Sequence, residues 1–529
     1  MPTRGQQRDT SRDGFRNKVE ATLLSGLKPF WGLVNVTPWL ARIANRLIVN
    51  NAVMKAPCRP LALSTQASYT NWSTLSDRTW FSRYLPAVPQ DRLPPVAEVA
   101  TLFKLRPERP PVLSDRSSLL FPSFAQWFTD GFLMTDQDRR RTRTNHQIDL
   151  SQLYGLNPTV TAALRRRSEA AGEKGKLKSV TSGNGEWAPP LYDATGRRDP
   201  AFALVPEPTH LPGDWPIEKR AALFAFGGER ANSTAYTAAI GTLFLREHNR
   251  LCTLLERNNP GWDDERVFQT ARNINIVLLI KLVVEEYINH ISPYWMKLLA
   301  DPSASYTAPW NRENWIPVEF NLLYRWHSLV PTDVKWGAAN VALAELRFDN
   351  RTLLQDGLVT AFASASQTRA WRIGMFNTTP MLDGVEMASI QQGRDNRLAS
   401  YNDYREVFKY PRVTRFEQIS SDPLVVSELR RIYVSVDQIE YFVGLFAEEL
   451  APRSAVPPLI GRMVGADAFS HALTNPLLSP HVYNAGTFTP AGMEVIERTS
   501  TLADLLARND MVPAGTRISM EAEGYQSVA

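Results

Sequence analysis

Cysteine is nearly absent: the chain has 2 cysteines, Cys58 and Cys252, in 529 residues. Two cysteines at this length provide no disulfide framework, so we expect a reducing compartment. The polar N-terminus, residues 1–20, has no apolar signal core, and we expect it to be a flexible arm. No stretch approaches about 18 uncharged apolar residues, which predicts no transmembrane span and a cytoplasmic location.

Familiar motifs are absent as well. The sequence contains no GxGxxG, P-loop or CxxC pattern, and none of its seven histidines forms an HExxH cluster. The basic runs at 139–143 and 164–178 have no interleaved aromatic residues, so we expect solvated loops and no nucleic-acid partner. The net charge of +5 fits an anionic substrate or a membrane surface.

Helical periodicity dominates what is present. Apolar residues recur at helical spacing in the segments 235–258, 264–291 and 427–450, while alternating strand patterns are scarce. Long Pro- and Gly-rich loops, such as 179–218, separate these segments. We predict an all-α protein whose core is organised by a large cofactor.

Residues 21–56 form short amphipathic pieces broken at Pro29 and Pro38. Short basic helices with Trp and Leu on one side are typical of segments that lie in a membrane interface. From the pattern alone, this interpretation and ordinary packing on the body of the protein are equally favoured.

The stretch NLLYRWHSLVP (321–331) places Tyr324 three residues before His327 in an apolar run. In a helix, residues at this spacing lie on one face, about 5–6 Å apart at Cβ. A single histidine in an apolar helix can be an axial haem ligand, and His327 is the best-placed candidate. For an isolated pair, a core helix with hydrogen-bonded Tyr and His side chains is the commoner explanation.

A family resemblance decides between these interpretations. The sequence resembles the animal-type haem peroxidases in LFLREHNRLC (243–252), IDLSQLYG (148–155), RIG (372–374) and RDNRLASYNDYREVF (394–408).

Within that superfamily, the resemblance narrows to the cyclooxygenases. Residues 320–331 resemble the segment with the radical tyrosine and proximal histidine, 285–294 the fatty-acid channel helix, and 27–40 the monotopic membrane-binding helices. The match runs in order over nearly the whole chain after residue 20. Microbial fatty-acid dioxygenases of the superfamily are the relatives that we expect to be most similar.

The resemblance implies a division into an arm (1–20), membrane-binding helices (21–56) and a haem-dependent catalytic domain (57–529). It implies that His327 binds the iron of a non-covalent haem b and that oxidised haem converts Tyr324 to a tyrosyl radical. That radical would take an allylic or bis-allylic hydrogen from an unsaturated fatty acid, and O2 would add to the carbon radical.

The distal side departs from the family pattern. The family has a Gln followed four residues later by the acid–base His, whereas this chain has Gln126 followed by Asp130. A carboxylate with a reference pKa of about 3.9 is a poorer base at neutral pH, so we expect weak peroxidase turnover. Arg230 stands where mammalian peroxidases have a distal arginine. It either stabilises charge on a bound peroxide or is a plain surface arginine.

Two further departures concern the cofactor and calcium. Thr129 and Ser233 stand where mammalian peroxidases esterify haem through acidic residues, so we expect non-covalent haem. Gly131 replaces the calcium-binding Asp of the family, while Asp149 and Ser151 remain. With one oxygen ligand lost, we expect no calcium.

The channel segment has Tyr287, Ile288, Ile291, Ser292 and Tyr294 at matching positions, which can line one side of a helix. Core packing is the alternative, although a serine and two tyrosines fit an amphiphilic channel better.

The carboxylate-binding arginine of cyclooxygenases aligns near Ala52, so Arg46 or Lys55 replaces it or the acid enters tail first. The serine that aspirin acetylates falls around 468–470, and we assign no residue to it.

The sequence therefore predicts a haem-dependent fatty-acid dioxygenase, peripheral on a membrane, that forms a hydroperoxide from a linoleate-like acid. The alternatives are a haem peroxidase that oxidises small donors, a prostaglandin-forming cyclooxygenase and a non-catalytic haem-binding membrane protein. The oligomeric state stays undetermined.

Overall fold

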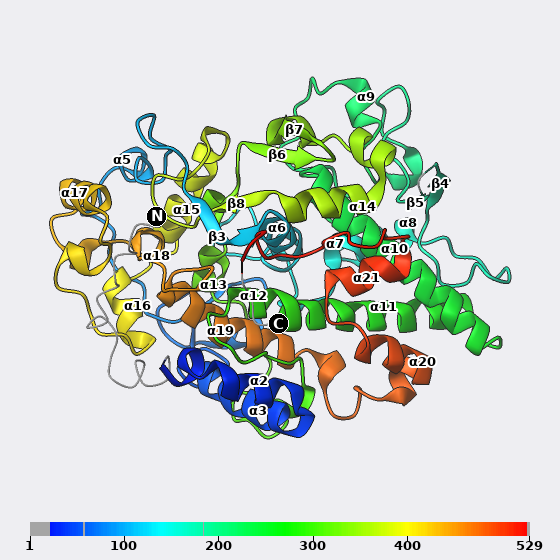
Figure 1. The fold of residues 1–529 in the computed structure, drawn as a ribbon, viewed down its shortest axis with the longest axis horizontal. Coiled ribbons are helices and arrows are strands. Elements are labelled where there is room, and N and C mark those ends of the chain that lie inside the picture. Colours follow the sequence, from blue (N-terminus) through cyan, green and yellow to red (C-terminus); the bar gives the residue numbers. More distant parts are fainter. Residues whose placement is uncertain (1–21, 57–58, 184, 526–529) are drawn as a thin grey trace.

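The computed structural model describes residues 22–56, 59–183 and 185–525, so the predicted arm at 1–20 lies outside the described residues. The described chain is mainly helical (Figure 1). Its few strands form only small two-stranded antiparallel sheets within the described ranges. The prediction of a helical protein is confirmed.

The helices vary widely in length, and the bounds of the α-helices are α2 (Lys28–Val36), α3 (Pro38–Val53), α4 (Trp72–Ser76), α5 (Val96–Ala100), α6 (Leu120–Phe132), α7 (Ser151–Tyr154), α8 (Pro158–Leu164), α9 (Ile217–Arg220), α10 (Ala235–Asn258), α11 (Asp264–Leu282), α12 (Asn289–Ile291), α13 (Val318–Leu323), α14 (Arg351–Gln367), α15 (Asp383–Asp395), α16 (Tyr401–Val407), α17 (Pro423–Ile432), α18 (Tyr441–Ala447), α19 (Pro458–Leu473), α20 (Ala485–Glu497) and α21 (Leu502–Asn509).

The strands pair antiparallel, as β1 (Leu63–Ser64) with β2 (Ser82–Arg83), β3 (Leu113–Ser118) with β8 (Arg369–Trp371), β4 (Val180–Ser182) with β5 (Gly185–Trp187), and β6 (Asp333–Trp336) with β7 (Ala339–Ala342).

Helices α6, α10 and α11 form the centre of the molecule (Figure 1). Helix α10 packs against α6, α11 and α14 and buries residues on every side. Thr234 caps its first turn by accepting a hydrogen bond from the backbone N–H of Thr237. Helix α6 is almost wholly buried. Helices that are buried on nearly every side form the interior of a protein, which agrees with the central place of these elements.

The long helical stretch Asp264–Ile291, which contains α11 and α12, is apolar and long enough to cross a membrane by length and composition. However, 78% of its most apolar window is buried inside the protein. The burial identifies this stretch as a core helix, which agrees with the sequence-based expectation.

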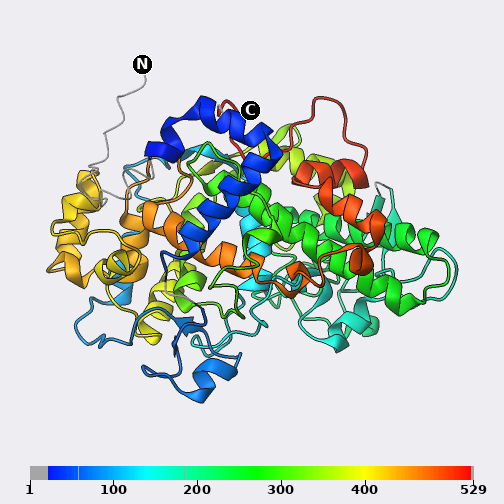
Figure 2. The same ribbon diagram turned by 90° about the horizontal axis from the view of Figure 1, so that it is seen from below.

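Helices α2 and α3 lie side by side at one edge of the molecule (Figures 1 and 2). The inner face of α3 packs against α19, with Val49 and Val53 in the main core. Asn45 ties α3 to the body, because its side chain bonds the backbone N and O of Leu299 at 2.9 and 3.0 Å. The outward face exposes large apolar side chains, which are Leu27, Phe30, Leu33, Val36, Trp39, Ile43, Leu47 and Met54.

Candidate functional site

The segment 321–331 is not the continuous helix that the spacing of Tyr324 and His327 suggested. Helix α13 ends at Leu323, Tyr324 caps it with φ −87° and ψ 11°, and a 3-10 turn begins at His327. Trp326 lies between them outside any helix, and its ring packs 4.9 Å from that of Tyr324. Tertiary packing of these aromatic rings overrides the helical pattern here.

The RIG segment anchors the turn that carries His327. The backbone N–H of Gly374 donates to Oγ of Ser328 at 3.2 Å. The Asn377 side chain donates to the backbone carbonyls of Arg372, in the RIG segment, and of Val112, which directly precedes β3. Two segments that carry the family resemblance are thus joined directly.

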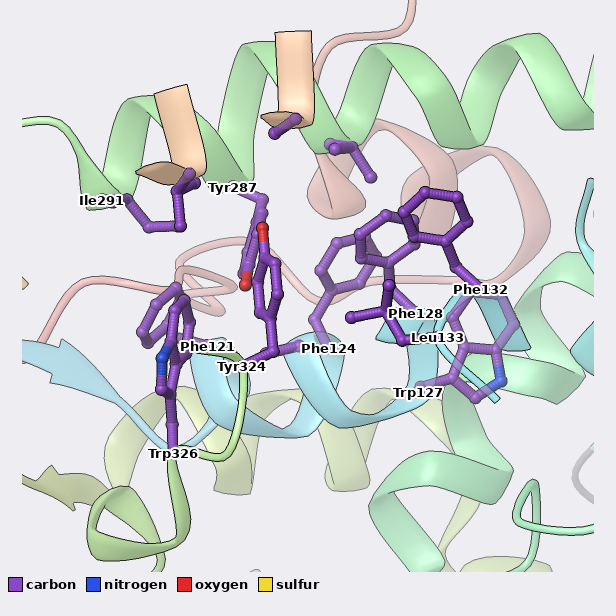
Figure 3. Packing of buried hydrophobic residues seen from close by; sticks show 14 of the residues in the cluster. Phe121, Phe124, Trp127, Phe128, Phe132, Leu133, Tyr287, Ile291, Tyr324 and Trp326 are labelled. Carbon is purple, nitrogen blue, oxygen red and sulfur yellow. The ribbon is translucent and has the colours of Figure 1, made fainter. Parts of the chain in front are cut away.

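Tyr324 and Tyr287 point toward one another, with their phenol oxygens facing (Figure 3). Both side chains are buried, and neither hydroxyl has a hydrogen-bond partner of acceptable geometry among the described residues. Burial raises the pKa of both phenols far above the ordinary value, so both stay protonated at neutral pH. A phenol in this state can lose a hydrogen atom but is not a base.

An apolar wall surrounds the two phenols. Phe121 of α6 stacks on Tyr287 at 5.3 Å and on Trp326 at 5.5 Å between ring centroids. Phe124 and Phe128 continue this wall along α6 (Figure 3). The phenylalanine side chains of this wall keep water and ionisable groups away from the two phenols.

The polar end of α6 brings three predicted residues together. Gln126 and Asp130 stand one turn apart, and Nη1 of Arg230 lies 3.3 Å from Oδ1 of Asp130. Burial raises the pKa of Asp130, while the charge of Arg230 acts in the opposite direction. The buried Oδ2 of Asp130 makes no hydrogen bond of acceptable geometry to any described residue. The raised pKa makes this carboxylate a better proton carrier near neutral pH than its reference value suggested.

Arg325 is a site residue that the sequence analysis missed. Its Nη2 donates to Oδ1 of Asn321 at 2.8 Å. Burial, followed by the charge of Arg230, lowers the pKa of Arg325 to about 10, and Asp130 and Glu386 oppose this effect. The negative charge of Asp130 therefore acts on both Arg230 and Arg325. The position between Tyr324 and Trp326 was the available signal, because a charged residue inside an apolar run is unusual.

The predicted channel residues do not line one side of a single helix, because they are divided among a π-helix, a short α-helix and an extended segment. Helix α11 continues as a π-helix, Val283–Ile288, which contains Tyr287, and then as α12, which ends at Ile291. Ser292 is already extended, and Tyr294 packs outside the helix beside α2. The wider turn changes the register of the residues that follow it.

The predicted replacements for a carboxylate anchor lie on α3 and its end. Nη2 of Arg46 donates to Oγ1 of Thr307 at 2.8 Å near the surface. Lys55 follows α3 and is half-buried. A different arginine, Arg59, is buried in an ion pair with Asp467 of α19, just before the unassigned segment 468–470.

The two positions that esterify haem in relatives have no carboxylate here. Thr129 donates its hydroxyl to the carbonyl of Ala125 at 2.7 Å, and Ser233 donates to that of Arg230 at 2.7 Å. Neither group can form the ester, so a haem at this site would be held without these bonds.

The Gln152 side chain lies beside Gly131, which stands where the family has a calcium-binding Asp. A Cβ on Gly131 would lie 2.8 Å from Cγ of Gln152, and one on Gly228 would lie 1.7 Å from its Oε1. The remaining cavity beside Asp149 and Ser151 has a volume of about 10 Å³, which is room for roughly one water molecule. Gln152 thus occupies the space between the two glycines.

The residues present fit a haem between His327 and α6. His327 lies in the interior, yet its side chain is 16% exposed, and that of Arg230 is 38% exposed. No hydrogen bond involves Nε2 of His327 among the described residues, so this nitrogen is available to a metal. The charges of Asp130 on α6 and of Glu386 near His327 both raise the pKa of Arg325. The polar end of α6 and the surroundings of His327 therefore border the same interior region.

Known proteins resemble the chain in sequence and in fold. The family described as animal haem peroxidase matches residues 135–519. Prostaglandin G/H synthase 2 of Bos taurus is 29% identical over 503 residues, which cover 92% of this chain and 80% of that protein. Prostaglandin G/H synthase 1 of Mus musculus is 30% identical over 497 residues, which cover 90% and 78%.

Among solved structures, the fatty acid alpha-dioxygenase of Oryza sativa superposes with a TM-score of 0.69 at 16% identity, covering 97% of this chain and 98% of that one. Peroxidase A of Dictyostelium discoideum gives a TM-score of 0.67 at 19% identity, covering 87% and 99%. These likenesses establish a shared fold. Together with the family match over most of the sequence, they show that the chain belongs to the animal haem peroxidase family.

Proposed function

We propose that the protein is a haem-dependent dioxygenase of unsaturated fatty acids. The observation that carries the proposal is the buried Tyr324 phenol, which faces Tyr287 within an aromatic wall and stands three residues before His327. The names of the similar prostaglandin G/H synthases and the fatty acid alpha-dioxygenase support oxygenation of a fatty acid.

The proposed reaction needs few polar groups. Haem bound through Nε2 of His327 would supply the oxidising equivalent that removes one electron and one proton from Tyr324. The Tyr324 phenoxyl takes a hydrogen atom from an allylic or bis-allylic C–H, which leaves a carbon radical and the phenol. O2 adds to this carbon, and the resulting peroxyl radical takes the hydrogen atom back from Tyr324. The sum is RH plus O2 giving ROOH, with the tyrosyl radical regenerated.

We propose a hydroperoxide as the product instead of a prostaglandin endoperoxide. Endoperoxide formation requires two oxygen additions and a tightly folded substrate with several double bonds. The carboxylate-binding arginine of cyclooxygenases aligns near Ala52 of this chain, and Arg46 is hydrogen-bonded near the surface. A substrate held less tightly favours a single oxygen addition.

A peroxidase acting on small donors is the second candidate. The ion pair between Asp130 and Arg230, beside Arg325, favours it because this arrangement can hold charge on a bound peroxide. Absence of a distal histidine counts against it, since Asp130 must carry the proton that histidine carries elsewhere.

Oxygen uptake with linoleate, compared with guaiacol oxidation by peroxide, separates these functions. A dioxygenase consumes oxygen and forms one hydroperoxide, which mass spectrometry of products from C18 and C20 acids identifies. Fast guaiacol oxidation without oxygen uptake would establish the peroxidase, and haem binding without either reaction would leave a non-catalytic haem protein.

We also propose that α2 and α3 bind one leaflet of a membrane, which would deliver a lipid-soluble substrate. The outward apolar side chains support this proposal: Val36 is 77%, Leu47 is 67% and Trp39 is 63% exposed. No acidic residue occurs in residues 21–76, whereas Lys28 and Arg42 lie on the two helices. Apolar burial and attraction to anionic headgroups would act together.

A further inference from the structure

Glu386 lies beside His327, although no sequence pattern singled it out. It stands in the first turn of α15 and is 2% exposed. Its Oε1 is 3.2 Å from Nδ1 of His327. Among the described residues, this ring nitrogen makes no hydrogen bond of acceptable geometry to Glu386 or to any other group, and Oε2 of Glu386 is also buried without a partner. A buried carboxylate and a ring nitrogen without a hydrogen bond therefore lie within hydrogen-bonding distance of each other.

The carboxylate of Glu386 is held in place. Oγ1 of Thr378 donates to Oε1 at 2.9 Å. Thr378 is fully buried and is itself fixed, because its N–H donates to the carbonyl of Phe103 and its carbonyl accepts from the N–H of Leu105. The first turn of a helix also favours a negative charge. These contacts fix the oxygen that faces His327.

We propose that Glu386 is a positioning residue for His327, whose Nδ1–H it accepts as a hydrogen bond. The proposal rests on the proposed role of His327 as the haem ligand. A carboxylate acceptor fixes the tautomer with the hydrogen on Nδ1, which leaves the lone pair of Nε2 for the iron. It also makes Nε2 a stronger electron donor, as carboxylate partners of metal-bound histidines do.

The consequence is a change in how strongly His327 donates electrons to the iron, which the identity of the ligand alone does not determine. Stronger donation from His327 stabilises the higher oxidation states of a bound iron and lowers its reduction potential. This would favour oxidation of the bound iron on a protein whose distal side has a carboxylate in place of histidine. The alternative is that Glu386 only accepts the hydroxyl of Thr378 and stabilises the fold.

Glu386→Gln tests the proposal, because the amide keeps the shape and removes the charge. In the ferrous holoprotein, the Fe–His stretch in resonance Raman spectra should move to lower frequency, and the midpoint potential should become more positive. Haem should dissociate about 10–100-fold faster. Asp383→Asn is the matched control: Asp383 lies in the same helical turn but pairs with Lys104 at 3.3 Å, so its loss should change none of these values.

An Fe–His stretch and potential that are unchanged in Glu386→Gln would overturn the proposal. If that variant does not fold, the same spectra are measured on Thr378→Val, which removes the hydroxyl that holds Glu386, and on the unmodified holoprotein. A stretch in the unmodified protein at the frequency of a histidine that donates only to a neutral carbonyl would equally overturn it. The band should disappear in His327→Ala. Its persistence there would contradict the ligand assignment itself, which is a different failure.

Discussion

At the scale of single residues, the buried hydroxyl of Tyr324 has opposite effects on stability and on reactivity. A buried hydroxyl without a hydrogen-bond partner is unfavourable for stability by about 1–3 kcal/mol. The same isolation leaves the O–H bond free to exchange a hydrogen atom with a substrate. We interpret the unsatisfied phenol as a site at which the chemistry, not stability, explains the residue.

Replacing Tyr324 with Phe should abolish oxygen uptake, because a phenyl ring cannot form a phenoxyl radical. Stability should change by less than about 1 kcal/mol, or rise, since among the described residues the lost hydroxyl makes no hydrogen bond of acceptable geometry and only approaches that of Tyr287. Haem absorbance and slow peroxide consumption should remain. The checks are oxygen electrode traces, thermal unfolding and the tyrosyl signal in electron paramagnetic resonance. Comparable oxygenation by the Phe variant would eliminate the radical mechanism.

His327→Ala should lose haem or the native Soret spectrum, because Nε2 of His327 is the proposed iron ligand. His290 is a suitable control, since it is also buried but its Nε2 is engaged with Oγ of Ser117 at 2.9 Å. His290→Gln should keep the spectrum if it folds. A native Soret band in His327→Ala would place the ligand elsewhere.

Asp130→His should raise peroxidase turnover by about 10-fold or more, since a positioned general acid–base group contributes about 10²–10⁴-fold. The ordinary imidazole pKa lies near neutrality, whereas burial raises the pKa of Asp130 from a much lower ordinary value. Asp130→Asn, which keeps the size and removes proton transfer, should lower turnover. Guaiacol oxidation measures both variants, and no gain with His would show that residue 130 does not meet the peroxide.

At the scale of elements, α3 serves two purposes. Its inner face belongs to the core through Val49 and Val53, while its outer face is apolar and exposed. Deleting residues 21–56 would therefore uncover the core as well as remove the surface. Point substitutions on the outer face test membrane binding without this complication.

Replacing Leu33, Trp39 and Leu47 together with Ser should reduce co-sedimentation with anionic vesicles more than about 100-fold. Each large apolar side chain is worth about 1.5–3 kcal/mol when fully buried. Haem content should not change, because these side chains face outward. Trp72→Ser is the control, since Trp72 lies on α4 and is 81% exposed. Undiminished sedimentation of the triple variant would exclude α2 and α3 as the membrane surface.

At the scale of the whole molecule, stability should not depend on calcium. Gln152 fills the space between Gly131 and Gly228, and Gly131 stands where the family has a calcium-binding Asp. EDTA should therefore leave the melting temperature of the holoprotein unchanged. Gly131→Asp should destabilise the protein, because the new Cβ would meet Gln152 at 2.8 Å. A fall in the melting temperature that calcium reverses, but magnesium does not, would contradict this prediction.

The sequence by itself determined the helical class and the family, because both depend on patterns that are local or ordered along the chain. Helical periodicity in 235–258 reflects burial of one element, and motifs such as 243–252 keep their identity without knowledge of the fold. The exposed apolar face of residues 28–53 was also readable as amphipathic pieces, although the pattern left packing and membrane binding equally favoured.

Only the tertiary structure decided how the site is arranged. Glu386 meets His327 from a helix 59 positions further along the chain, and Arg230 meets Asp130 across 100 positions. The break after α13 and the π-helix at Tyr287 arise because side chains from several elements compete for one interior volume. Local pattern cannot encode that competition, since the partners that settle it are distant in sequence.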